Sequence, residues 1–230
     1  MTGHRDDFFS IAARCQRTGA FGAAISSSSP AVGSRCVWIA PGHGVVLSQN
    51  ITDPAIGQAG IALLEQGAAA AAVLGQLALR DSFEWRQVAV LDRSGTTAWS
   101  SGRQTLGCHH VVVGQDCVAA GNLLAETGVI DAMVAAFAQS TDLDLPQRLL
   151  DALAAGLERG GEAGPVRSAA LKVCTEESWP TVDLRVDWDD APIAALIRAW
   201  DVYRPQMANY ILRARDPSGA PSFGVPGDPA

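Results

Sequence analysis

Polar side chains that could do chemistry occur at alternating positions near the start of the chain. Ser10 and Arg14 lie in the apolar run 8–15, and Ser26 lies in a run of small residues, 20–27. Successive side chains of a strand point to opposite faces of its sheet. We therefore expect a hairpin with one apolar face and one uncrowded face that carries Ser10, Arg14 and Ser26. A sandwich strand with a solvated outer face would give the same pattern.

Histidine and cysteine residues raise the question of a metal or a base. Cys108, His109 and His110 are adjacent, but on a strand only the first and third share a face, and no third ligand is apparent. We therefore predict no metal site. His43 is close in sequence to Gln49 and is a candidate general base, although a position between two glycines also suits a simple turn.

The composition limits the classes of partner. The chain has 230 residues, a net charge of -7 and no basic cluster, which argues against nucleic acid or an anionic membrane as a partner. Five scattered cysteines without a C-x-x-C pair favour reduced thiols and a cytoplasmic location. The polar residues 1–7 lack the apolar core of a secretory signal, and the longest apolar stretch, 60–79, is interrupted by polar residues.

Strand and helix patterns indicate the order of elements. The predicted strands cover residues 8–15, 20–27, a run ending at 49, 85–91, 96–101, 107–120, 169–174 and 180–188, and the predicted helices cover 54–67, 68–80, 130–140, 145–159 and 191–203. Because hairpin-linked strands are segregated from paired helices, we predict an α+β fold built on antiparallel sheet. Residues 8–214 would form a single domain, between a polar leader (1–7) and a Pro- and Gly-rich tail (215–230) expected to be disordered.

Short motifs in a fixed order extend over most of the chain. Phe-Ser-Ile-x-Ala-Arg begins at Phe9 and is followed by Thr-Gly-x-x-Gly-x-Ala, Pro-Ala-Val-Gly-Ser, Ser-Gln, Arg-Gln-Val, Ala-Gly-Asn-x-Leu, Arg-Leu-Leu-x-Ala-Leu, Gly-Gly…Ser-Ala-Ala-Leu and Asp-Leu-Arg-Val-Asp. This ordered set, which reaches to about Trp200, resembles the DUF1028 family, which is placed among proteins with the N-terminal-nucleophile (Ntn) hydrolase fold. The resemblance implies a four-layer αββα sandwich and a hydrolase of a carbon–nitrogen bond.

The resemblance also implies a nucleophile at the start of the first strand. In Ntn enzymes an N-terminal Thr, Ser or Cys attacks a carbonyl, and its own α-amine is the base. Family members typically begin Met-Thr-Phe-Ser, but here Phe8 stands at the aligned position after seven additional residues. Three explanations stay open: Ser10 acts with another base, Thr2 is exposed by methionine removal and folds back, or the chemistry has been lost.

Other family positions carry over individually. Arg14 matches the family's arginine and could bind a carboxylate through two parallel hydrogen bonds. Ser26, Gln49 and Asn122 match strand ends at which side chains could line one pocket and orient an amide or a carboxylate. Turn or capping chemistry is the alternative for the two amides. Glu162 stands where the family usually has aspartate.

Two functions therefore follow as expectations. One is a hydrolase of an amide bond in a small polar substrate, with Ser10 and Ser26 as catalytic candidates and Arg14, Gln49 and Asn122 as substrate-binding candidates. The other is a non-catalytic small-molecule-binding or assembly protein on the same fold, in which the N-terminal nucleophile has been lost. We predict no cofactor for either function, and a homodimer is compatible with both.

Overall fold

The computed structural model describes residues 7–222 and 224–226. Its strands are β1 (Phe8–Arg14), β2 (Phe21–Ser27), β3 (Val37–Ala40), β4 (Gly44–Asn50), β5 (Arg86–Asp92), β6 (Thr97–Ser101), β7 (His110–Gly114), β8 (Cys117–Asn122), β9 (Ser168–Cys174) and β10 (Val182–Val186). Its helices are α1 (Pro54–Glu65), α2 (Ala70–Leu77), α3 (Gly128–Gln139), α4 (Leu145–Glu158), α5 (Pro192–Tyr203) and α6 (Met207–Arg215), with short 3-10 turns η1 (Val32–Ser34), η2 (Phe83–Trp85) and η3 (Arg204–Gln206).

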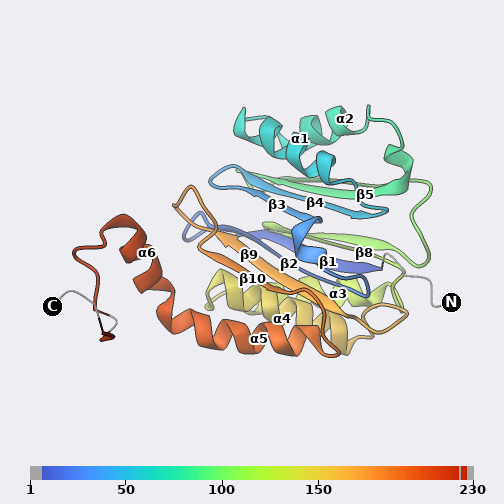
Figure 1. Ribbon diagram of the computed structural model, residues 1–230. Helices are drawn as coiled ribbons and strands as arrows, with labels where there is room; N and C mark the ends of the chain where they lie inside the picture. Colours follow the sequence, from blue (N-terminus) through green and yellow to red (C-terminus); the bar gives the residue numbers. More distant parts are fainter. Residues whose placement is uncertain (1–6, 223, 227–230) are drawn as a thin grey trace.

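Two antiparallel sheets lie face to face between layers of helices (Figure 1). The six-stranded sheet has the order β10-β9-β2-β1-β8-β7, and the four-stranded sheet has the order β3-β4-β5-β6. Helices α1 and α2 cover the four-stranded sheet, while α3, α4 and α5 cover the six-stranded sheet (Figure 1). The predicted four-layer αββα sandwich is confirmed.

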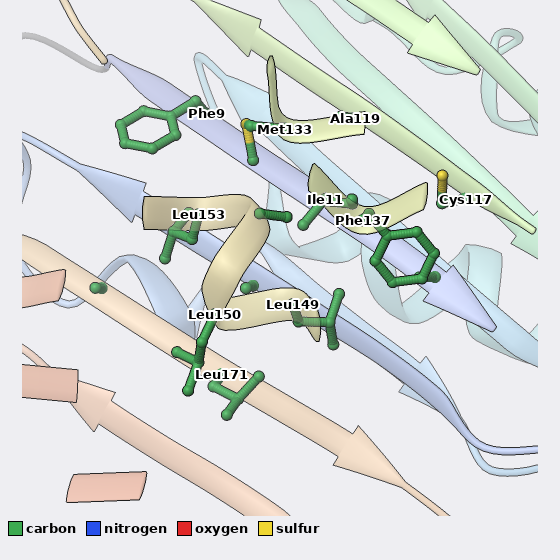
Figure 2. Packing of buried hydrophobic residues seen from close by; sticks show 14 of the residues in the cluster. Phe9, Ile11, Cys117, Ala119, Met133, Phe137, Leu149, Leu150, Leu153 and Leu171 are labelled. Atoms are coloured by element: carbon green, nitrogen blue, oxygen red, sulfur yellow. The ribbon is translucent and has the colours of Figure 1, made fainter. Parts of the chain in front are cut away.

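Strand β1 lies in the middle of the larger sheet, between β2 and β8. Its side chains alternate as the period-two pattern predicts. Phe9 and Ile11 point into the core beneath α3 and α4 (Figure 2), and Ala13 belongs to the same core. Phe8 and Ala12 point into the core between the two sheets. Any group at the start of β1 on the Phe8 side is therefore enclosed by sheet on both sides.

The expected shared face of Ser10 and Ser26 is wrong. The register of the hairpin pairs Ser26 with Phe9 and Ser10 with Ile25, so the two hydroxyl groups lie on opposite sides of the sheet. The small residues of β2 also leave no room for a ligand, because a Cβ atom added at Gly22 would lie 2.7 Å from a methyl group of Leu149 in α4. These small residues let α4 approach the sheet closely.

Three details differ from the predicted elements. The single strand expected to end at residue 49 is a hairpin, β3–β4, which turns at residues 41–43. The strand region 107–120 is likewise a hairpin, β7–β8. Helix α6 was not predicted, and none of its residues is buried. The tail contains no helix or strand in its described residues after Arg215, and most of the leader lies outside the described residues.

Candidate functional site

Ser10 lies on the side of β1 that faces the four-stranded sheet. Its Oγ donates to Gln49 Oε1 on β4 at 2.7 Å, and Gln49 Nε2 donates to Gln87 Oε1 on β5 at 2.6 Å. Gln87 Nε2 donates to the Gly121 carbonyl oxygen at 3.1 Å and to Ser101 Oγ at 3.0 Å. Ser10, Gln49 and Gln87 are at most 1% exposed. This chain of hydrogen bonds joins the two sheets across the interior.

A pair of asparagines lies at the adjacent ends of β4 and β8. Asn122 Nδ2 donates to Asn50 Oδ1 at 3.2 Å, and both residues are fully buried. Asn50 Nδ2 donates to the Trp85 carbonyl oxygen at 2.7 Å, and Asn50 Oδ1 also accepts the backbone N–H of Leu106 at 3.1 Å. Asn50 has a φ of 67°, a left-handed conformation that asparagine adopts more readily than most residues. The hydrogen bonds of this pair therefore connect the segments at Trp85 and Leu106 to the ends of β4 and β8.

The surroundings of Ser10 do not activate its hydroxyl group. A serine nucleophile needs a base that accepts its proton. The Ser10 hydroxyl instead donates to the neutral amide oxygen of Gln49, and its other acceptor is the Ala120 carbonyl oxygen at 3.3 Å. Among the described residues, no imidazole, carboxylate or amine forms a hydrogen bond with Ser10. The geometry is that of a structural hydroxyl group.

Two other candidates lie apart from Ser10. Ser26 Oγ donates to the carbonyl oxygen of Ser168 at 2.9 Å, on the opposite side of the sheet. His43 lies in the turn between β3 and β4, whereas Gln49 is near the other end of β4. The two positions are six residues apart, which is about 20 Å along an extended chain. The structure therefore brings together Ser10, Gln49 and Asn122, but neither Ser26 nor His43.

Phe8 stands at the position where the sequence resemblance predicts a nucleophile, and it is fully buried. Because Asp7 precedes it in the chain, the nitrogen of Phe8 is part of a peptide bond. The carbonyl oxygen of Asp7 accepts a hydrogen bond from Ser27 Oγ at 2.6 Å, and the guanidinium group of Arg35 lies 5.9 Å from the centre of the Phe8 ring. Neither a nucleophile nor a free amine is present at this position.

Glu162 approaches the same end of β1 and was not among the predicted site residues. Its Oε2 accepts the backbone N–H of Ser28 at 2.9 Å, and only 4% of the residue is exposed. Burial, followed by the negative charge of Asp7, raises the pKa of the Glu162 carboxyl group to about 9, despite the opposing hydrogen bond from Ser28. Glu162 is therefore a neutral acid near pH 7. Its family correspondence was the only sequence signal for it.

Arg14 lies at the other end of β1, four residues beyond Ser10 and about 13 Å along the strand. Its Nη1 donates to Asp116 Oδ1 at 3.0 Å and to the Ser94 carbonyl oxygen at 3.0 Å. The charge of Arg14 is therefore paired within the protein. The structure does not place this guanidinium group beside the Ser10 hydroxyl.

A cavity of about 260 Å³ opens beside Arg14. It lies among the β1–β2 turn, the β7–β8 turn and the helices α3 and α4, and the guanidinium groups of Arg17 and Arg148 also line it. Phe137 and Cys117 form part of its wall, and Figure 2 shows both near the opposite end of β1 from Phe9. Sequence reasoning missed this site, because its residues come from four separate segments.

Comparison with known proteins identifies the family. Residues 8–196 match the family model described as "Family of unknown function (DUF1028)". The chain belongs to the DUF1028 family. The DUF1028 protein SPO2555 from Silicibacter pomeroyi, known from a crystal structure, shares 30% sequence identity with this chain. The two structures have a TM-score of 0.79, and the match covers 86% of this chain and 89% of that chain. Anbu (ancestral beta-subunit) from Yersinia bercovieri is 12% identical, with a TM-score of 0.42 over 87% of this chain and 96% of that chain. No curated protein matches the chain.

Two further findings concern the described part of this DUF1028 chain. None of its helices there combines the length and the apolar character needed to cross a membrane. In the same residues, no group of three or more His, Cys, Asp and Glu side chains could hold a metal ion. His110 Nε2 lies 3.9 Å from Asp131 Oδ1, which links β7 to α3.

Proposed function

We propose that this DUF1028 chain is a small-molecule-binding protein that does not hydrolyse its ligand. The observation that carries the proposal is the fully buried ring of Phe8, at the position where the sequence resemblance predicts an N-terminal nucleophile. An aromatic ring cannot attack a carbonyl group. The Asp7–Phe8 peptide bond also removes the α-amine that would be the base in an Ntn enzyme.

The surroundings of Ser10 support the same proposal. Its proton is directed at the Gln49 amide oxygen, which is too weakly basic to remove it, and its side chain has no solvent exposure. A substrate could reach it only if the two sheets separated and the amide network broke. Such an opening would expose several buried polar groups that now satisfy one another.

A second candidate function is hydrolysis of a carbon–nitrogen bond in a small polar substrate, with Ser10 as the nucleophile. One observation favours it: Ser10, Gln49 and Asn122 belong to two adjoining hydrogen-bonded groups between the sheets. Amide side chains of this kind could hold the carbonyl group of a substrate. The absence of a base bonded to Ser10 among the described residues favours the binding function instead.

The experiment uses the full chain and a panel of small amides, with mass spectrometry of the products and of the intact protein. We expect an intact chain that retains the residues before Phe8 and releases no product. Amide hydrolysis that disappears in Ser10→Ala, while thermal unfolding shows that this variant is folded, would overturn the proposal. Hydrolysis by a chain that mass spectrometry shows to be processed to a new N-terminal residue would also overturn it.

A second variant tests whether the fold can hydrolyse amides once an N-terminal threonine is restored. Phe8→Thr combined with deletion of the residues between Met1 and position 8 would restore the family's N-terminal threonine after methionine removal. The same deletion with Phe8 retained is the matched control. If only the threonine variant gains hydrolysis, the loss of function is located at Phe8, as proposed. If the control also hydrolyses amides, another residue is the nucleophile and the proposal fails.

A further inference from the structure

Two cations in the cavity beside Arg14 lack a carboxylate partner. Within residues 7–222 and 224–226, neither Arg17 nor Arg148 forms a salt bridge. Arg148 Nη2 donates to the Phe137 carbonyl oxygen at 2.9 Å, and Arg17 Nη2 donates to the Leu143 carbonyl oxygen at 3.5 Å. The Nε of Arg148 is buried and has no acceptor in the described part of the chain. A guanidinium group that lines a cavity without a carboxylate partner gains from an anion bound beside it.

The charge of this cavity is opposite to that of the whole protein. Three guanidinium groups line it against the single carboxylate of Asp116, in a chain whose net charge is -7. That carboxylate is already paired with Arg14. Burial, and more weakly the neighbouring charge of Arg17, lowers the pKa of the Arg148 guanidinium group. A bound anion would offset both effects, because it would stabilise the charged form of Arg148.

The rest of the cavity wall limits the kind of anion. Val134, Phe137 and Ala138 of α3 are apolar parts of the wall. The guanidinium carbon of Arg148 lies 3.8 Å from the centre of the Phe137 ring, so the ring holds the orientation of the cation. A bare oxyanion such as phosphate would leave the apolar wall in contact with water. A carboxylate with an apolar body would cover the wall and bind the cations at once.

The size of the cavity limits the ligand to a small molecule. Its volume of about 260 Å³ lies just below the range of roughly 300–1,000 Å³ that is usual for ligand pockets. Guanidinium groups bind carboxylates through two parallel hydrogen bonds, and Arg17 and Arg148 approach from different segments. The cavity can therefore hold one carboxylate group and a body of about the size of one ring.

The thiol group of Cys15 lies in the part of the cavity wall formed by the β1–β2 turn. Burial alone would raise its pKa, but hydrogen bonds from the side chain and backbone of Thr18 and from the backbone of Arg17, with the Arg17 charge, lower the pKa below its ordinary value. The β1–β2 turn thus directs donors and positive charge toward one point of the cavity wall. The effect is local to this turn, because burial raises the pKa of Cys117, elsewhere on the cavity wall, to about 11.

From these observations we propose that the cavity among the β1–β2 turn, the β7–β8 turn, α3 and α4 binds a small organic carboxylate. Arg17 and Arg148 bind the carboxylate group, and the apolar body packs against Phe137 and Val134. The inference rests on the proposed small-molecule-binding function and names the chemical class of its ligand.

Calorimetric titration of the full chain at low salt tests the ligand class with three probes. Phenylacetate carries the carboxylate and a ring, 2-phenylacetamide is its uncharged counterpart, and inorganic phosphate has the charge without the ring. We expect phenylacetate to bind at least about tenfold more tightly than either of the others. Only phenylacetate has both a carboxylate group for the cations and a ring that covers the apolar wall. Equal binding of the amide, or tighter binding of phosphate, would overturn the assignment of an organic carboxylate.

Variants test the location of the site. Arg17→Met and Arg148→Met should each weaken phenylacetate binding about tenfold, and Arg148→Lys should retain part of the affinity. Arg17 is exposed, so its substitution tests the site even if Arg148→Met fails to fold. Arg198→Met, at an exposed position of α5, is the matched control and should bind like the natural chain. Unchanged affinity in Arg17→Met, or an equal loss in Arg198→Met, would overturn the site.

The two proposals fail in different ways. If the chain hydrolyses amides, the proposed function fails whether or not phenylacetate binds. If the chain hydrolyses nothing and phenylacetate does not bind, only the carboxylate site fails.

Discussion

Two clusters of polar groups at opposite ends of β1 differ in how they are satisfied: the network of Ser10, Gln49 and Gln87, and the arginines of the cavity. At the Phe8 end, Ser10, Gln49 and Gln87 donate to and accept from one another and are at most 1% exposed. At the other end, Arg17 and Arg148 line a cavity without a carboxylate partner among the described residues. Polar residues that satisfy one another in an interior indicate a structural role. Charges left unpaired beside a cavity indicate a ligand.

The largest expected effect is a pH dependence of the folding stability that arises from Glu162. It tests whether the polar groups at the Phe8 end of β1 are excluded from solvent. The pKa of this carboxyl group is about 9 in the folded protein, against an ordinary value of 4.5. Between these pH values the folded state holds a proton that the unfolded state has lost. The stability from Glu162 is therefore full below about pH 4 and declines as the pH rises toward 9, by a total on the order of 5 kcal/mol.

The measurement is thermal unfolding from pH 5 to pH 9. Glu162→Gln should unfold at a temperature close to that of the natural chain at pH 5, and higher by roughly 10 °C near pH 9. Glu158→Gln, at an exposed position near the end of α4, is the matched control and should follow the natural chain. Parallel pH profiles for Glu162→Gln and the natural chain would show that Glu162 is not buried as a neutral acid.

The next effect tests the amide network itself. Gln49→Leu removes the acceptor of Ser10 and the donor to Gln87 Oε1, and it leaves both partners buried. We expect a loss of about 3 kcal/mol in the free energy of unfolding, since each unsatisfied group costs about 1–3 kcal/mol. Denaturant unfolding measures this loss, and Gln139→Leu at an exposed position is the control. A Gln49→Leu chain as stable as the control would mean that the network does not hold the sheets together.

The smallest effect separates Arg14 from the two unpaired arginines. Arg14→Met breaks the ion pair with Asp116, a partly exposed interaction worth about 1 kcal/mol or less. Because its charge is already paired, we expect phenylacetate affinity to fall less than about threefold, against about tenfold for Arg17→Met. Titration of both variants under one set of conditions makes the comparison. A larger loss in Arg14→Met would assign the carboxylate to Arg14 instead.

The sequence predicts correctly those features that depend on a single strand, such as which side chains share a face. The alternation of β1 placed Phe9 and Ile11 on one side and Phe8 and Ser10 on the other, because side-chain period does not depend on the neighbouring strand. The relation of Ser10 to Ser26 depends on hairpin register, which the turn sets and strand periodicity does not show. The sequence alone therefore could not decide which hydroxyl groups lie together.

The candidate cavity also depends on contacts between elements, so the sequence alone could not predict it. Arg17 and Arg148 are far apart in the sequence, and only the packing of α4 beneath β1 brings them to one cavity. Gln87, which completes the network of Ser10, appears in the sequence only as the middle of a short family motif. Contacts of this kind follow from the tertiary arrangement, and single residues carry no signal for them.

The most direct test of the account is an NMR titration of the ¹⁵N-labelled chain with phenylacetate. We predict shifts of the backbone signals of Cys15, Arg17 and residues 115–117, with those of Ser10, Gln49 and Asn122 unchanged. Shifts centred on Ser10 and Gln49 would contradict the account, because they would place the ligand at the end of β1 that we describe as closed.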